Sequence, residues 1–250
     1  MAVAVALGGL LVAGCAEEDH GPFRPPGGHG GGGSSQGGDA AVTDADGDAG
    51  GLLRGRVCIV TDLRAPDACP NVTEQAGVTV GVRGTAEVTT SGADGRFALS
   101  AAGDTLVLDV APGSITLQRA TVPVAVTAAL VNAPVMTRAA WTAVEDALGV
   151  VVPDGGGMVA VYVEDGGAPV AGVTFATAAG SSVAPFYDDG AALAWTQQGG
   201  TGAAGVALLV DVPAGTATLD GVAPDLRVAR FTVPVVTDAI TFVRVGLAAP

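Results

Sequence analysis

The feature that most constrains the fold is a series of short β-rich runs, separated by turn residues roughly every eight to twelve positions from Gly55 onward. Val78, Val80 and Val82 alternate with small or polar residues, which predicts one buried face. The runs 85–90 and 96–100 flank a Ser-Gly-Ala-Asp-Gly hairpin signal. The other runs in this half of the chain cover residues 55–60, 105–110, 114–119 and 121–126. The pattern predicts an all-β sandwich or barrel with about seven strands.

Three segments of this region resemble a known family. They are Gly77-Val-Thr-Val80, then Thr90-Ser-Gly-Ala-Asp-Gly-Arg-Phe-Ala-Leu99, then Val110-Ala-Pro-Gly113. Together they are similar to the bacterial carboxypeptidase regulatory-like domain over roughly residues 52–127. The resemblance implies a prealbumin-like (transthyretin-like, Ig-like) β-sandwich that carries no peptidase activity.

A second copy is indicated by three echoes in the same order. Asp109–Leu117 recurs as 211–219, Ala76–Val80 as 171–175, and Thr121–Val124 as 232–235. We therefore predict tandem sandwiches, over residues 52–133 and 150–250. The second copy is divergent, because Thr-Gly-Ala-Ala-Gly-Val at 201–206 replaces the Asp-Gly-Arg-Phe turn and residues 177–198 resemble an insertion.

The residues between the copies, 134–149, are predicted to form a linker containing the only helix. Apolar residues recur at helical spacing from Met136 to Leu148, and Gly149 suits the position after a helix C-terminus. Trp141 is expected to pack this helix against one sandwich or their junction rather than to bind a ligand.

The N-terminal residues Leu11-Val-Ala-Gly-Cys15 resemble the lipobox of bacterial lipoproteins. The resemblance implies that residues 1–14 are a signal peptide and that Cys15 is acylated, with membrane lipid as its partner. Ala16 follows the cysteine where Asp favours inner-membrane retention, which implies the outer membrane. No Lys or Arg precedes the apolar run, although signal peptides normally begin with a basic segment. A start codon assigned too far downstream would explain this.

Residues 15–51 are predicted to be a flexible, acidic tether, because Gly, Ser and Asp predominate and apolar groups are few. Asp44-Ala-Asp-Gly-Asp48 resembles the opening of a calcium loop, but Ala49 and Gly55 stand where an EF-hand needs Gly and Glu.

The composition excludes several function classes. The formal charge of −14 disfavours nucleic acid as a partner. All eleven basic residues are Arg, and the two histidines, His20 and His29, lie in the tether. The predicted folded part therefore lacks the usual general bases and His-based zinc sites. We expect no catalytic residues, no cofactor and no metal site, and a structural or protein-interaction role in the cell envelope with an unknown envelope protein or glycan as partner.

Two further sites are predicted. Cys58 and Cys69 are expected to form a disulfide, since their spacing does not match zinc or redox pairs and the protein is expected to be exported. The alternative function is binding of glycan or Ca²⁺ at a possible ligand site, formed by Tyr187, Asp188, Asp189 and Trp195.

Overall fold

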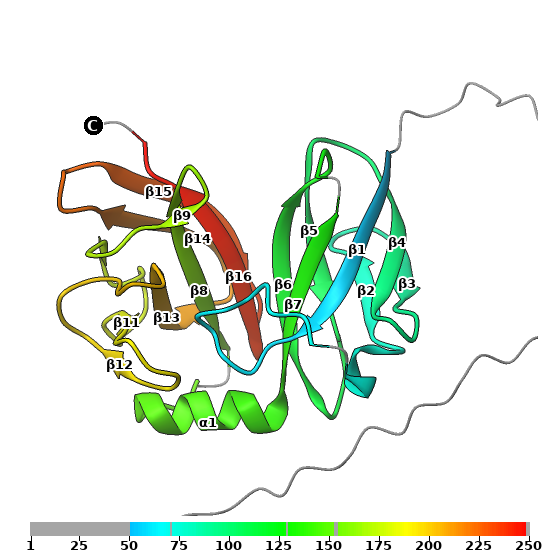
Figure 1. Ribbon diagram of the computed structural model, residues 1–250, viewed down its shortest axis with the longest axis horizontal. Coiled ribbons are helices and arrows are strands. Elements are labelled where there is room, and N and C mark those ends of the chain that lie inside the picture. Colours follow the sequence, from blue (N-terminus) through cyan, green and yellow to red (C-terminus); the bar gives the residue numbers. More distant parts are fainter. Residues whose placement is uncertain (1–50, 71, 129, 153–154, 249–250) are drawn as a thin grey trace, which may run out of the picture. The chain divides into compact units, whose positions relative to one another are not determined.

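The computed structural model describes residues 51–70, 72–128, 130–152 and 155–248 (Figure 1). Cys15, the tether and its acidic Asp44–Asp48 stretch lie outside the described residues. The described part is almost entirely β-structure with one α-helix, which confirms the predicted all-β class. Within it, no helix is both long enough and apolar enough to cross a membrane.

The first sandwich has two facing sheets. One sheet has the order β4-β1-β7, in which β1 runs antiparallel to β4 and parallel to β7. The other has the order β3-β2-β5-β6 and is antiparallel throughout. Its strands are β1 (Gly51–Ile59), β2 (Thr79–Val82), β3 (Val88–Thr90), β4 (Arg96–Ala101), β5 (Thr105–Val110), β6 (Leu117–Ala125) and β7 (Val131–Thr137), and a short 3₁₀ turn covers Thr73–Gln75.

The second sandwich repeats this topology. One sheet has the order β13-β8-β16, in which β8 is antiparallel to β13 and parallel to β16, and the other has the order β10-β14-β15. β9, β11 and β12 are short additions to the first of these sheets. The strands are β8 (Gly156–Asp165), β9 (Ala168–Pro169), β10 (Thr174–Phe175), β11 (Phe186–Asp188), β12 (Trp195–Thr196), β13 (Val206–Pro213), β14 (Gly215–Val222), β15 (Val228–Val235) and β16 (Ala239–Gly246).

A buried hydroxyl joins equivalent loops in the two copies. Ser91 Oγ accepts a hydrogen bond from the Val78 amide at 2.9 Å and donates to a carbonyl in the preceding loop. Thr201 Oγ1 does the same with the Val173 amide at 3.0 Å. The turn 201–205, whose sequence differs from the Asp-Gly-Arg-Phe turn of the first copy, therefore occupies the same place as 91–95.

The glycine that ends each of these turns is also equivalent. Gly95 has φ +77° and Gly205 has φ +69°, and the carbonyl of each accepts the amide of Val57 or Val163 on the first strand of its own copy. A β-carbon at Gly205 would lie 2.7 Å from the Val163 carbonyl oxygen. These positions therefore need glycine both for its backbone angle and for its close approach to the neighbouring strand.

Two of the three sequence echoes fall on equivalent strands. The echo at 76–80 lies at β2 and β10, and the Thr-Val-Pro-Val echo lies on β6 and β15. The echo at 109–117 lies between β5 and β6, whereas 211–219 lies between β13 and β14. By strand pairing, β14 is the counterpart of β5, so this third match does not join equivalent parts of the fold.

The two sandwiches are joined edge to edge. β6 of the first runs parallel to β16 of the second over residues 119–121 and 239–241, and Figure 1 shows the strands side by side at this point. Thr121 and Thr241, both fully buried, pair their hydroxyls across the junction at 2.8 Å. The described residues of both sandwiches belong to one compact unit.

A shared core crosses this junction. β8 is buried on both faces, because Val159, Val161 and Val163 face the inside of the second sandwich while Met158 and Ala160 join the core of the first. This explains why β8 reads as a continuous apolar run rather than as an alternating strand.

The helix α1 (Arg138–Leu148) packs into this shared core through Trp141, Val144 and Leu148. The expected packing role of Trp141 is confirmed. The helix begins two residues later than predicted, because Met136 belongs to β7 and the Thr137 side chain accepts a hydrogen bond from the Ala140 amide as its N-cap. Gly149, with φ +65°, ends the helix as expected.

Two parts of the strand prediction were wrong. The runs predicted at 114–119 and 121–126 are not two strands, because one continuous strand, β6, covers 117–125, and β7 was not predicted at all. Pro134 lies in the middle of β7, where it is paired with Cys58 of β1. Proline in a run argues against a strand, yet it is accepted here because a free edge does not require its amide hydrogen. The domain boundary expected at residue 133 falls inside β7.

Candidate functional site

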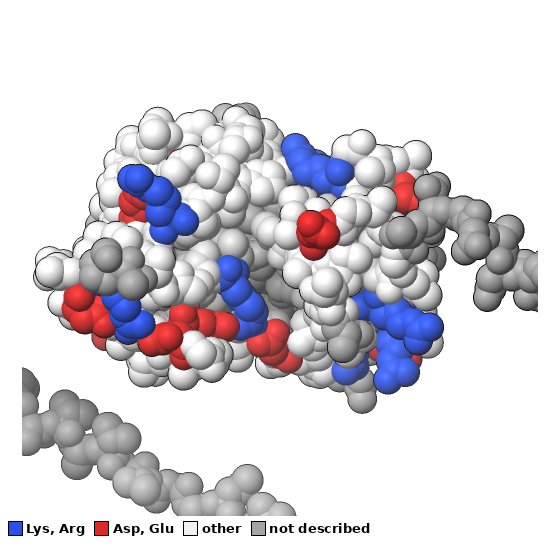
Figure 2. All heavy atoms as spheres, turned by 90° about the horizontal axis from the view of Figure 1, so that it is seen from above, with Lys and Arg blue, Asp and Glu red and all other residues white. Residues whose placement is uncertain are grey.

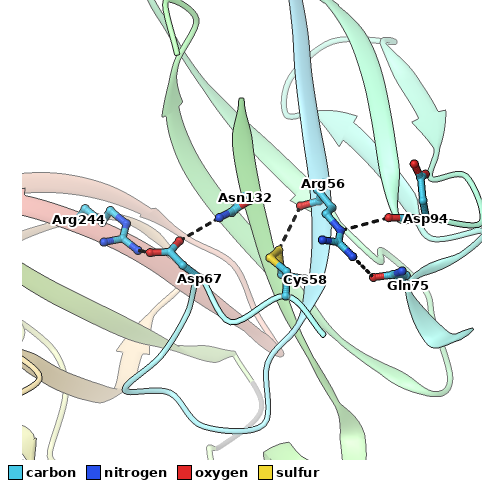
Figure 3. The surroundings of a disulfide bond; sticks show 8 residues. Arg56, Cys58, Asp67, Gln75, Asp94, Asn132 and Arg244 are labelled. Carbon is cyan, nitrogen blue, oxygen red and sulfur yellow. Dashed lines mark hydrogen bonds and ion pairs between the residues drawn. A yellow bond between two sulfur atoms is a disulfide. The ribbon is translucent and has the colours of Figure 1, made fainter. Parts of the chain in front are cut away.

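The disulfide is the first predicted site that the structure forms. Cys58 lies near the end of β1, and the chain returns to Cys69 with a Cα–Cα distance of 4.5 Å, so the predicted bond is confirmed. Figure 3 shows the loop between them projecting away from β1. Val60 and Leu63 are buried in the shared core, so the loop covers the outer face of the second sandwich.

Charged groups at the tip of this loop hold it against the second sandwich. Asp67 accepts one hydrogen bond from the Asn132 side chain of β7 and forms an ion pair with Arg244 of β16 (Figure 3). Arg244 also pairs with Glu164 of β8. A single arginine therefore links the disulfide loop to two strands of the other copy.

A second ion pair stiffens the loop near its start. Asp62 accepts a 2.6 Å hydrogen bond from Arg64, and this bond holds the pKa of the Asp62 carboxyl below its ordinary value. The Asp62 carboxylate also accepts the Arg64 backbone amide at 2.9 Å, which closes a turn.

Next to this loop, β6 and β16 enclose a groove with a volume of about 340 Å³. Figure 1 shows the two strands diverging from their paired ends, and Figure 2 shows a hollow between the two sandwiches when the molecule is seen from above. Small numbers of acidic and basic side chains lie beside one another on this face, which is otherwise uncharged (Figure 2). The walls are mostly apolar and are formed by residues 66–67, 122–125, 128, 130–132, 134, 162 and 242–244.

Tyr162 of β8 lies at the groove and beneath the disulfide loop. It is 4% exposed, its ring stacks on Phe242 with 6.5 Å between centroids, and the Arg244 guanidinium lies 5.6 Å above it. Its hydroxyl has no hydrogen-bond partner among the described residues. Burial raises the pKa of this hydroxyl far above its ordinary value. A buried donor without a partner is costly, so an acceptor that reached this hydroxyl on entering the groove would stabilise it.

The predicted ligand residues Tyr187 and Asp188 lie elsewhere, on β11, and are committed to the fold. Both are less than 5% exposed. The Tyr187 hydroxyl accepts the Phe175 amide at 2.8 Å. The Asp188 carboxylate accepts three backbone amides, from Gly202, Ala204 and Val206, at 2.8 to 3.1 Å. Asp188 thus organises the equivalent turn of the second copy.

The other two predicted residues contribute differently. Asp188 and Trp195 are paired across β11 and β12, and Trp195 is partly buried against the shared core. Asp189 is exposed and makes only a backbone contact, with Ala194. Among the described residues, no three His, Cys, Asp or Glu side chains come together in a way that could hold a metal ion. Ligand binding at this turn stays a prediction. Of the two carboxylates in the predicted site, only that of Asp189 is exposed.

Sequence reasoning did not find Tyr162, Arg244 or Asp67. One signal was present: Tyr162 is the only residue with a ring in the apolar run 156–165, where a buried hydroxyl needs a partner. The groove itself depends on the register between β6 and β16, strands about 120 residues apart, and no local pattern encodes that register.

No protein-family model and no curated protein matches the chain. Among solved structures, it is similar to the Bacillus anthracis TIE protein, with 15% identity over 80% of this chain and 34% of that chain and a TM-score of 0.25. It is also similar to GBS52, the minor pilin of Streptococcus agalactiae, with 10% identity over 80% and 97% of the two chains and a TM-score of 0.24. A third similar structure is the shaft pilin SpaA of Lactobacillus rhamnosus GG, with 11% identity over 80% of this chain and 98% of that chain and a TM-score of 0.22.

This chain spans about a third of the TIE protein chain. These TM-scores are too low to show a shared fold, so the sandwich assignment rests on the strand pairing described above.

Proposed function

We propose that this protein is a non-enzymatic lipoprotein of the cell envelope, which presents a joined pair of β-sandwiches at a membrane through an acylated Cys15. The observation that carries the proposal is the Cys58–Cys69 disulfide. Stable disulfides are typical of exported proteins and rare in reducing compartments. The chain has three cysteines, so this pairing leaves Cys15 as the single remaining thiol, within a lipobox-like sequence.

The arrangement of charges supports a presenting role rather than chemistry. Asp109 pairs with Arg119 and Asp220 with Arg230, each across neighbouring strands of one sheet. Asp165 and Asp225 share Arg227. These carboxylates and guanidiniums neutralise one another at separate places on the two sandwiches and do not converge on one site.

The proposed mechanism is passive. Lipid on Cys15 would hold the protein, with the outer membrane as the proposed location because Ala16 follows the cysteine. As a flexible coil of about 36 residues, the tether would have an end-to-end distance on the order of 30–35 Å. This reach separates the sandwiches from the lipid surface and leaves them accessible to an envelope partner.

Metabolic labelling with radioactive palmitate tests the anchor. The protein is expressed with a functional signal peptide and compared with Cys15→Ser, which should lose the label. The matched control is the double variant Cys58→Ser/Cys69→Ser, which lacks the disulfide but should keep the label. Unlabelled wild-type protein would overturn the proposal.

A further inference from the structure

The groove exists because the pairing between β6 and β16 stops after Thr121 and Thr241. On β6 the next residue that faces β16 is Pro123. Its partner on β5 is Val107, whose carbonyl oxygen accepts the Arg83 amide and so points toward β2, away from β6. In an antiparallel ladder, two directly opposed residues direct their backbone groups either toward each other or both away from each other. Because the Val107 carbonyl points away from β6, the backbone groups of Pro123 point away from β5 and toward the groove.

Proline brings a carbonyl but no amide hydrogen to this edge. In the second copy, the Pro234 carbonyl of the repeated Thr-Val-Pro-Val sequence accepts a hydrogen bond from the Thr241 hydroxyl at 3.0 Å. One missing donor thus ends the β6–β16 ladder and lets the two strands diverge.

Beyond this point, two strand edges face each other across the groove without a strand partner among the described residues. Residues 122–125 of β6 pair only with β5, and residues 242–246 of β16 pair only with β8. Such edges present rows of backbone carbonyls and amides that can accept an added strand. The side chains beside them are apolar, including Val124, Leu130 and Phe242.

We propose that this groove binds an extended peptide segment of a partner protein, which adds as a strand between β6 and β16. The Tyr162 hydroxyl donates a hydrogen bond to a backbone carbonyl of that segment, and alternate apolar side chains of the segment contact Val124 and Leu130. The proposal deepens the proposed interaction function by naming the surface and the chemistry of the partner.

The groove favours a peptide over a glycan. Sugars bind aromatic faces that are open to solvent, whereas the Tyr162 ring is covered by Phe242 and by Arg244. The charged groups nearby, Asp67, Arg244 and Glu164, are already paired with one another. What remains unpaired is backbone edge, apolar surface and one buried hydroxyl donor, which is the chemistry that an extended chain complements.

A displayed library of random short peptides is selected against the purified full chain carrying Cys15→Ser with its disulfide intact. Enriched peptides are synthesised, and their Kd is measured by fluorescence polarisation. Binding measured on this unlipidated protein does not depend on anchoring, so failure here is distinguishable from failure of the palmitate test.

Two variants and a control locate the binding. Leu130 is 57% exposed at the groove, and Leu130→Arg should weaken binding at least tenfold by blocking it. Leu226 is 70% exposed outside the groove, and Leu226→Arg should leave Kd unchanged. Tyr162→Phe keeps the ring and removes the donor, so it should weaken binding by about 5- to 10-fold.

Bound peptide should also slow amide hydrogen exchange in residues 122–125 and 242–246. The proposal is overturned if no peptide is enriched, if the enriched peptides bind Leu130→Arg as well as wild type, or if a glycan array gives a ligand that Leu130→Arg abolishes while peptides do not bind.

Discussion

Replacing Asp188 should reveal how much one buried carboxylate contributes to the second sandwich. Asp188→Ala removes the acceptor of three backbone amides and leaves them in a region where the residue is 3% exposed. Hydrogen bonds to a charged group contribute about 1.5–3 kcal/mol each, and water entering the space left by the side chain recovers part of this. We expect the free energy of unfolding to fall by about 4 kcal/mol, a large part of the 5–15 kcal/mol typical of a folded protein.

Asp188→Asn should cost less, about 1–2 kcal/mol, because one oxygen can still accept two of the amides. Here Oδ1 accepts the amides of Gly202 and Val206, whereas Oδ2 accepts only that of Ala204. The exposed neighbour is the matched control, and Asp189→Ala should change the stability by less than about 0.5 kcal/mol.

Equilibrium urea unfolding, followed by tryptophan fluorescence and by circular dichroism, measures the three variants. The reasoning is refuted if Asp188→Ala costs less than about 1 kcal/mol, or if Asp188→Ala and Asp189→Ala cost the same. A stabilising shift on adding Ca²⁺ that Asp189→Ala abolishes would instead support the predicted ligand turn.

Three other predictions follow from the described contacts. Cys58→Ser/Cys69→Ser should lower the free energy of unfolding by roughly 3 kcal/mol and speed proteolysis of the loop, and equal protease resistance of oxidised and variant protein would contradict this. Gly205→Ala should lower the free energy of unfolding by more than about 1 kcal/mol, because position 205 combines a positive φ with a 2.7 Å approach to a carbonyl oxygen. The control is Gly246→Ala, where the added β-carbon meets nothing within 4 Å, and it should change that free energy by less than about 0.5 kcal/mol in the same urea assay. Burial raises the pKa of the Tyr162 hydroxyl in the folded state. The stability linked to this shift is therefore complete below a pH of about 10, where the unfolded tyrosine ionises, and is lost as the pH rises further. Thermal melts in alkaline buffers should show a smaller loss for Tyr162→Phe than for wild type, and an identical loss would count against the buried hydroxyl.

The sequence predicted those parts of the fold that local chemistry determines. The alternation of Val78, Val80 and Val82, the turn ending at Gly95 and the apolar face of the helix at Trp141 each depend on neighbouring residues only. The disulfide was predictable because the cysteine spacing does not match zinc or redox pairs and the lipobox-like sequence predicts export.

Prediction failed where distant contacts decide the outcome. β7 contains Pro134, which argues locally against a strand, and only its pairing with β1 and, at its end, with β6 makes it one. Tyr187 and Asp188 resembled a ligand site, since a motif of aromatic and acidic residues does not reveal that its polar atoms are already bonded internally. The groove was invisible for the same reason: it depends on where two strands from different copies stop pairing.

The position of β16 in the chain has a consequence for the order of folding. It follows every other described strand, yet it pairs with β6, 120 residues earlier, and its Arg244 reaches Asp67, 177 residues earlier. Contacts between residues so far apart in the sequence form slowly. During synthesis, the N-terminal segments of a chain also emerge before the C-terminal ones. The N-terminal sandwich therefore waits with an unsatisfied edge and an uncovered loop until β16 arrives. An export route that releases the whole chain before folding begins, or a chaperone that covers the β6 edge in the meantime, suits this order of events.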